Sequence, residues 1–407
     1  MKKFALIIAF IITATFSFSQ NNMVVSAFNY HRNGKLDKAK EAIDKATVHP
    51  KTMSNAKTWY YRGNIYIDIY WSQDDVYKNL DPDALNKAYE AYTKATELDT
   101  KKNYTIDILQ RMPIVAQAYF DDGANKYNLG IEAVDDPDST LAIKEFNNAV
   151  NSFEKAYEIY NEVGTIDTLS LYYIAYTANL AHNYEVALDK FNTLVEYDYP
   201  EPGIYSSLSK IYIDYKDDEV KSEEYLKLGM QKFPGNEYLL FATINFYLER
   251  DKTAEALDLL EIAAKLEDVN ETIFYAIGVQ YNKIVEDTNQ NNEARDNAFE
   301  NAVNAYKNAL EINPDYFDPN YNMGALYVNK AIAIIEIANQ LPIDATEEYN
   351  IMKEEADNYL SSSLPYLEKA HELQPDDINT LGSLKDIYTR LKMYDKMKEI
   401  NAKIENR

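Results

Sequence analysis

The sequence predicts an all-α protein in which antiparallel helix pairs stack one after another along the chain. Three observations lead to this fold class. Only 11 glycines and 12 prolines occur in 407 residues, which favours long helices over the turn-rich texture of β-proteins. Small and aromatic residues recur three or four positions apart, the spacing of one helical face. The pattern then repeats with a period close to 34 residues, which is typical of repeat proteins.

The segment NAVNAYKNALEINPDYFDPNYNMGALY, residues 301–327, shows the elements of one unit. Ala302, Tyr306 and Ala309 fall on one helical face, where the small residues let a partner helix approach and Tyr306 fills the space between. Pro314 follows the end of this helix, where its missing N–H does least harm. Gly324 lies within the next helix at a cost of about 1 kcal/mol, which indicates that a neighbouring backbone comes close there.

The unit recurs along the chain. Four positions are matched 34 residues later: Ser222, Leu226, Gly229 and Pro234, then Ala256, Leu260, Ala263 and Asp268. We count about nine such units. The arrangement resembles the tetratricopeptide repeat, most clearly over residues 169–330 and more weakly around 100–165 and after 376. This resemblance implies a right-handed superhelical solenoid over residues 20–407, with a concave groove that binds proteins; a division near residue 165 is a minor alternative.

Four segments depart from the regular spacing, near 67–87, 124–148, 282–301 and 330–362. Gly63 to Ala88 spans 25 residues and Gly278 to Ala302 spans 24, where the family expects about 12. We interpret the excess as lengthened helices in taller hairpins. For 330–362 we expect an inserted turn or an extra helix, and for 124–148 an inserted loop.

The N-terminus has the features of a secretory signal peptide. Lys2 and Lys3 precede an uncharged apolar run that ends at Ser17-Phe18-Ser19, so we expect residues 1–19 to be removed before Gln20. A retained anchor is the alternative, although the run is shorter than the ~20 residues that span a bilayer. The chain has no cysteine, which excludes a lipid anchor of the lipoprotein type. We therefore expect an exported protein, periplasmic or secreted, with no transmembrane segment after cleavage.

The formal charge of −25 restricts the class of partner. Nucleic acid is disfavoured, because proteins that bind phosphate backbones use Lys and Arg to displace counterions. The expected partner is a protein or peptide that is neutral or basic, or a loosely held cation. Acidity that merely keeps an exported protein in solution is an equally good interpretation. The oligomeric state is not predicted.

The sequence offers no convincing catalytic, metal or cofactor site. His31, His49, His182 and His371 are far apart and never form the i, i+4 pair of a helical metal site. Phosphate-binding glycine loops and nucleophile elbows are missing from the sequence. We interpret the acidic pairs, among them Asp121–Asp122, as solvated helix caps. We therefore expect no catalytic residue, no metal and no cofactor.

The resemblance assigns groove positions to the first helix of each hairpin. These positions are Tyr60, Asn64, Tyr172, Tyr176, Asn179, Phe241, Asn245, Tyr275, Asn282 and Tyr321. Aromatic rings beside asparagines suit an extended peptide, since the amides can bond its backbone and the rings can cover its side chains. The alternative is that these residues only help neighbouring hairpins to stack. Tyr60 and Phe241 stand where the family's carboxylate-binding members need a lysine, so that binding mode is not expected.

Together these patterns predict a non-enzymatic protein-interaction scaffold of the cell envelope that binds a peptide or protein segment in its groove. A glycan- or peptidoglycan-associated binding protein is the first alternative. An enzyme with its site in 330–362 is the least expected.

Overall fold

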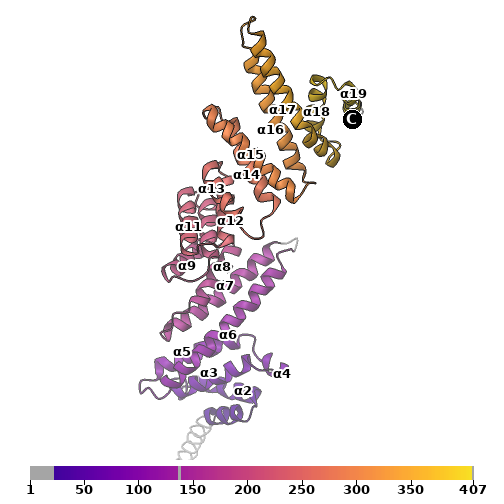
Figure 1. The fold of residues 1–407 in the computed structure, drawn as a ribbon. Coiled ribbons are helices and arrows are strands. Elements are labelled where there is room, and N and C mark those ends of the chain that lie inside the picture. The colour runs from indigo at the N-terminus through magenta and orange to yellow at the C-terminus, as the bar shows by residue number, and fades with distance from the viewer. Residues whose placement is uncertain (1–22, 136–138, 406–407) are drawn as a thin grey trace, which may run out of the picture. The chain divides into compact units, whose positions relative to one another are not determined.

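The computed structural model describes residues 23–135 and 139–405. Every regular element in this part of the chain is a helix, which confirms the all-α prediction (Figure 1). The predicted signal peptide, residues 1–19, lies outside the described residues. None of the described helices combines the length and apolar character needed to cross a bilayer.

The chain divides into two compact units. The first holds residues 1–204 and 214–216, and its helices form consecutive antiparallel pairs. A helix over residues 23–32 precedes α2 (Leu36–Thr47), and α3 (Ala56–Tyr70) pairs with α5 (Ala84–Leu98). The two remaining pairs are α6 (Thr105–Glu132) with α7 (Ser139–Glu162) and α8 (Thr168–Leu180) with α9 (Tyr184–Glu196).

The second unit holds residues 205–213 and 217–407. Its pairs are α10 (Gly203–Asp214) with α11 (Glu219–Lys232), α12 (Glu237–Leu248) with α13 (Thr253–Ala263), α14 (Glu271–Glu286) with α15 (Asn292–Ile312), α16 (Phe317–Ala338) with α17 (Thr346–Leu373), and α18 (Ile378–Arg390) with α19 (Tyr394–Glu405). The described part of the chain thus contains nine helical hairpins.

Local sequence explains where many of these helices begin. Asp167, Asn236 and Asp377 each accept a hydrogen bond from a backbone N–H of the helix that follows, at 3.1, 3.0 and 2.7 Å. Side-chain caps of this kind satisfy donors that the first helical turn cannot bond internally. The interpretation of Asp121–Asp122 as a cap is wrong, because both residues lie in the middle of α6.

The small residues of the repeat serve the packing between the two arms of a hairpin. Ala302, Tyr306 and Ala309 are fully buried, as the spacing indicated. A Cβ placed on Gly278 would lie 2.4 Å from the Tyr306 ring, and one on Gly324 would lie 2.4 Å from Leu367. The glycines therefore make room for a large side chain from the partner arm, and not for a neighbouring backbone as we expected.

The irregular segments differ in how they use their extra residues. The α14–α15, α6–α7 and α16–α17 hairpins have long arms, with α6 and α17 each reaching 28 residues against 12 in α12. The expectation of an extra helix within 330–362 is wrong, because α16 and α17 occupy this segment and only the turn at 339–345 separates them. The inserted loop expected at 124–148 is likewise replaced over most of its length by the ends of α6 and α7. The expectation of taller arms at 67–87 is wrong. There α3 and α5 have 15 residues each, and the excess forms a connection that contains the one-turn helix α4 (Asp75–Lys78), capped by Asp74.

Candidate functional site

Tyrosine rings from three segments of the first unit meet beside α8. Tyr172 and Tyr176 lie one turn apart on α8, with ring centroids 6.0 Å apart and an interplanar angle of 16°. Tyr199, which follows α9, stacks against Tyr172 with ring centroids 5.6 Å apart. The ring centroid of Tyr127 on α6 lies 6.5 Å from that of Tyr176. We call Tyr127, Tyr172, Tyr176 and Tyr199 the α8 tyrosine face.

The hydroxyl groups of the α8 tyrosine face have no hydrogen-bond partner among the described residues. Tyrosines elsewhere in the chain behave differently. The hydroxyl of Tyr66 donates to Asp44, that of Tyr247 to Glu223 and that of Tyr281 to Glu261. Tyr176 is 37% exposed and the other three side chains are half-buried, so the face is accessible. It can therefore offer hydroxyl groups to a ligand without breaking an internal bond.

The surroundings of this face are apolar and acidic. Burial raises the pKa of the Tyr172 hydroxyl to about 12, and the carboxylate of Glu201 acts in the same direction. Burial also raises the pKa of Tyr127 and of Tyr199, where Glu201 and Asp167 add to the effect. These hydroxyls consequently stay protonated at neutral pH and remain able to donate.

Asn179 completes the set that α8 brings together. It lies three residues after Tyr176 on the same helix and is half-buried. Its side-chain amide has no hydrogen-bond partner in the described part of the chain. Three of the predicted groove residues, Tyr172, Tyr176 and Asn179, thus share one face with available polar groups.

The predicted pair on α3 behaves differently. Tyr60 stacks on Tyr104 with ring centroids 4.9 Å apart, and its hydroxyl donates to Asp107 at 3.3 Å. Asn64 is only 5% exposed, and its Oδ1 accepts a 2.7 Å hydrogen bond from the hydroxyl of Tyr92. The Tyr92 ring lies on the adjacent Gly63, which places the Tyr92 hydroxyl within hydrogen-bond distance of the Asn64 side chain. The Asn64 amide is therefore part of the core. The assignment of Asn64 to an exposed groove is therefore wrong.

The predicted residues of the second unit lie on three helices. On α12, Phe241 packs into the core while Asn245 is exposed. On α14, Asn282 donates to Glu286 at 2.9 Å, and on α16, Tyr321 stacks on Phe317 at 6.0 Å.

Tyr275 of α14 is held mainly by its own hairpin and the turn beyond it. Its ring lies 5.3 Å from that of Tyr316 and 6.2 Å from that of Tyr306. Its hydroxyl accepts a hydrogen bond from the amide of Asn322 at 3.2 Å. These contacts agree with the alternative that several groove positions serve the stacking of hairpins.

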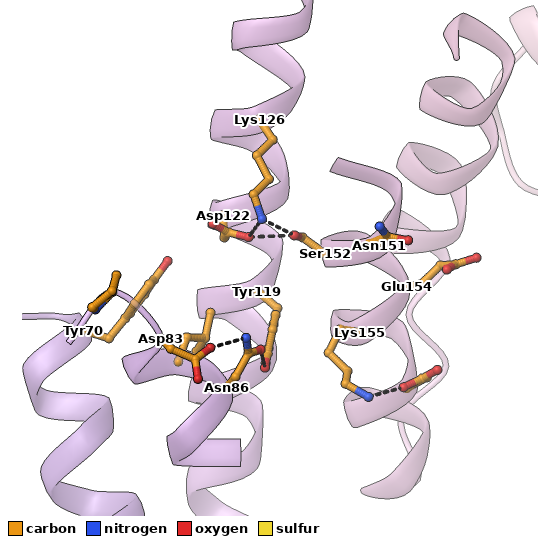
Figure 2. A pocket seen from close by; sticks show the side chains of 13 residues that line it. Tyr70, Asp83, Asn86, Tyr119, Asp122, Lys126, Asn151, Ser152, Glu154 and Lys155 are labelled. Atoms are coloured by element: carbon orange, nitrogen blue, oxygen red, sulfur yellow. Dashed lines mark hydrogen bonds and ion pairs between the residues drawn. The ribbon is translucent and has the colours of Figure 1, made fainter. Parts of the chain in front are cut away.

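A polar cavity of about 380 Å³ lies between α5 and the α6–α7 hairpin (Figure 2). Lys126 bonds to Asp122 at 2.6 Å and to Ser152 at 3.0 Å, and Ser152 donates to Asp122 at 2.6 Å. Lys155 pairs with Glu158 at 2.7 Å. The bonds of Ser152 to Lys126 and Asp122 join α7 to α6 and stabilise the packing of these two helices.

No group of three or more His, Asp or Glu side chains within residues 23–135 and 139–405 has the arrangement of a metal site. Two members of the α8 tyrosine face, Tyr127 and Tyr199, were not predicted from the sequence. Tyr127 lies seven residues after Phe120, a spacing that places both aromatic rings on one face of a helix. The sequence therefore contained a signal for an aromatic face on this helix.

A family model described as the TPR repeat matches residues 293–330, which include most of α15 and the beginning of α16. Residues 293–330 of this chain are therefore similar to a tetratricopeptide repeat. The matched segment contains Ala302, Tyr306 and Gly324, the residues whose spacing first indicated the repeat. A search of curated proteins found no relative of this chain.

Several solved structures are similar to it. YrrB, described as a TPR protein with an unusual peptide-binding site, is 18% identical, with 57% of this chain and 98% of that one covered and a TM-score of 0.39. A TPR repeats protein from Bacteroides fragilis is also 18% identical, covering 66% of this chain and 98% of its own, with a TM-score of 0.29. A thermophilic TPR protein of Thermus thermophilus is 21% identical, with coverages of 50% and 98% and a TM-score of 0.28.

Proposed function

We propose that this chain is a tetratricopeptide-repeat protein and acts as a non-enzymatic scaffold of the cell envelope that binds an extended segment of a partner protein. The observation that carries the proposal is the α8 tyrosine face, where four half-buried to exposed tyrosines hold hydroxyl groups that the protein itself does not use. A buried aromatic anchor with available polar groups is the usual centre of a protein-binding surface.

The binding mode follows from the chemistry of this face. The hydroxyls of Tyr172 and Tyr176 donate to backbone carbonyls of the bound segment, while the amide of Asn179 pairs with its backbone N–H and C=O groups. The rings cover apolar side chains of the segment. Glu201 and Asp167 give the surroundings a negative potential, so the preferred segment is neutral or basic.

The other predicted positions have secondary roles in this proposal. Tyr60, Phe241, Tyr275, Asn282 and Tyr321 are at least half-buried by neighbouring side chains and would add contact area only. The exposed Asn245 offers its amide to a bound segment. Export by way of the signal peptide at 1–19, to the periplasm or the medium and without a lipid anchor, is part of the proposal and is supported by the sequence features of that segment.

A panning experiment tests the function. The chain from residue 20 onward is exposed to a random phage-displayed peptide library, together with the variant Tyr172→Ala/Tyr176→Ala. We expect the wild type to enrich a consensus peptide that the variant binds at least about tenfold more weakly, since two aromatic anchors are lost. Tyr30→Ala is the matched control, because Tyr30 and Tyr176 are both 37% exposed. Equal binding by wild type and double variant would disprove the proposed face.

Glycan binding is the second candidate, because the nearly parallel rings of Tyr172, Tyr176 and Tyr199 also suit the apolar faces of sugars. Sedimentation with purified peptidoglycan distinguishes the two. Saturable binding that the Tyr172→Ala/Tyr176→Ala variant loses, without any enriched peptide, would favour the glycan.

A further inference from the structure

A second cavity, in the unit formed by residues 205–213 and 217–407, has a different chemical character. It has a volume of about 270 Å³ and lies where the α14–α15 hairpin meets α16. Its apolar lining includes Phe299 and Ile334, which are buried, and Val285 and Ile337, which are more exposed. The volume is at the small end for ligand pockets, so it suits a molecule of a few carbon atoms.

One cation lines this cavity without forming an ion pair. The Nε of Arg295 donates to the backbone carbonyl of Val285 at 2.7 Å, which fixes the plane of the guanidinium. No ion pair or further hydrogen bond occupies its terminal nitrogens among the described residues. A guanidinium held in this way presents two parallel N–H donors, the geometry that matches a carboxylate.

The neighbouring charged side chains each have a partner, which is an oppositely charged group for Lys330 and Asp296 and neutral amide groups for Glu286 and Asp287. Lys330 binds Asp296 at 2.6 Å, and Glu286 accepts a hydrogen bond from Asn282 at 2.9 Å. Asp287 accepts hydrogen bonds from Asn289 and Gln290, and these bonds lower its pKa more than the charge of Arg295 does. Arg295 is therefore the group at this cavity that a ligand anion can reach without displacing a carboxylate of the protein.

From these contacts we infer that the cavity binds an aliphatic carboxylate, with its carboxylate on Arg295 and its tail against Phe299, Val285 and Ile334. The anion comes either from a free short-chain acid or from the C-terminal residue of a polypeptide, which share this chemistry. This site lies on helices other than those of the α8 tyrosine face and does not depend on the function proposed for that face.

Calorimetric titration of the chain from residue 20 onward tests the inference. The probes are hexanoate, hexanamide and hexylamine, which share a tail and differ in charge. We expect hexanoate to bind with a dissociation constant on the order of 1 mM and hexanamide at least about tenfold more weakly. Equal binding of hexanoate and hexanamide, or no binding of hexanoate, would overturn the inference.

Variants locate the site. Arg295→Gln is expected to weaken hexanoate at least about tenfold. Lys307→Gln is the matched control, because it removes the same charge from an exposed position on the same helix and should leave binding unchanged. Since loss of the bond to Val285 could disturb the fold, Ile337→Glu is a second variant. Ile337 is 57% exposed, so the added carboxylate should repel hexanoate without disturbing the core. Retained affinity in both variants would refute the site.

A final comparison identifies the source of the anion. N-acetyl-leucine imitates a chain end, and N-acetyl-leucine amide lacks its charge. Tighter binding of N-acetyl-leucine than of hexanoate supports a polypeptide C-terminus, and the reverse order supports a free acid. Binding of the amide as tightly as N-acetyl-leucine contradicts the role of Arg295. The Tyr172→Ala/Tyr176→Ala variant should bind hexanoate normally, which separates failure of this inference from failure of the proposed function.

Discussion

Replacement of Gly278 by alanine tests whether the repeat glycines are sites of packing. In an exposed helix this change would stabilise the protein by about 1 kcal/mol, because alanine is the better helix former. Here the new Cβ would lie 2.4 Å from the Tyr306 ring, whereas ordinary contact begins at 3.4 Å, so the ring would have to move by about 1 Å (3.4 − 2.4). Tyr306 is completely buried, so its ring can move only by displacing neighbouring core side chains.

The expected magnitude follows from these two opposing effects. Overpacking of a buried site costs about 1–3 kcal/mol, and a displacement of this size in a closed core belongs near the upper end. After the helical gain is subtracted, we expect Gly278→Ala to destabilise the protein by about 2 kcal/mol. Gly382 of α18 is the control, because no atom lies within 4 Å of its added Cβ. Gly382→Ala should stabilise the protein by about 1 kcal/mol.

Urea unfolding followed by circular dichroism at the helical band measures both changes. Stacked repeats can unfold in steps, so hydrogen exchange of amides in α14 and α15 should accompany it and locate the loss. The two variants should move the urea midpoint in opposite directions. If Gly278→Ala proves as stable as Gly382→Ala, the ring does not fill the space over the glycine and the packing argument fails.

Two further predictions concern stability. Tyr92→Phe removes the donor to Asn64 and leaves a buried acceptor unpaired, so we expect a loss of about 1–3 kcal/mol in urea unfolding, and an unchanged midpoint would contradict the buried bond. Hydrogen bonds from Lys227 and Lys252 lower the pKa of Glu223 from 4.5 to about 2. Because the pKa is lower in the folded state, the Glu223 carboxylate stabilises the fold above pH 4.5, and this stabilisation is lost as the pH falls toward 2. Between these pH values the stability of Glu223→Gln in urea unfolding should therefore fall less than that of the wild type. Parallel pH profiles of the two proteins would contradict the prediction.

The sequence predicted the packing within hairpins well, for a physical reason. Ala302 and Tyr306 face the partner arm because helical periodicity alone places them on one side, and periodicity is a local property. Residue counting was less informative at 67–87. The additional residues between Gly63 and Ala88 can lengthen either the two helices or the connection between them. The number of residues is the same in both cases, so it does not distinguish them. The cap at Asp74 and the proline at position 82 were the local signals for a connection.

The candidate site was predicted only in part. Offsets within one helix were sufficient to bring Tyr172 and Tyr176 together, because both lie on α8. They could not show that Asn64 turns inward, since its partner Tyr92 comes from the opposite arm, 28 residues away. Tyr199 reaches the face from beyond α9, and its approach depends on how that chain segment packs.

The ring-on-glycine contacts have a consequence for biogenesis. The ring of Tyr92 lies on Gly63, that of Phe153 on Gly123 and that of Tyr306 on Gly278, and each contact joins the two arms of a single hairpin. The two helices of a hairpin can thus pack together as soon as the second helix has been synthesised, before the next hairpin exists. Closure of one hairpin buries the residues between its two arms, whereas the face that packs on the next hairpin stays exposed until that hairpin has been synthesised.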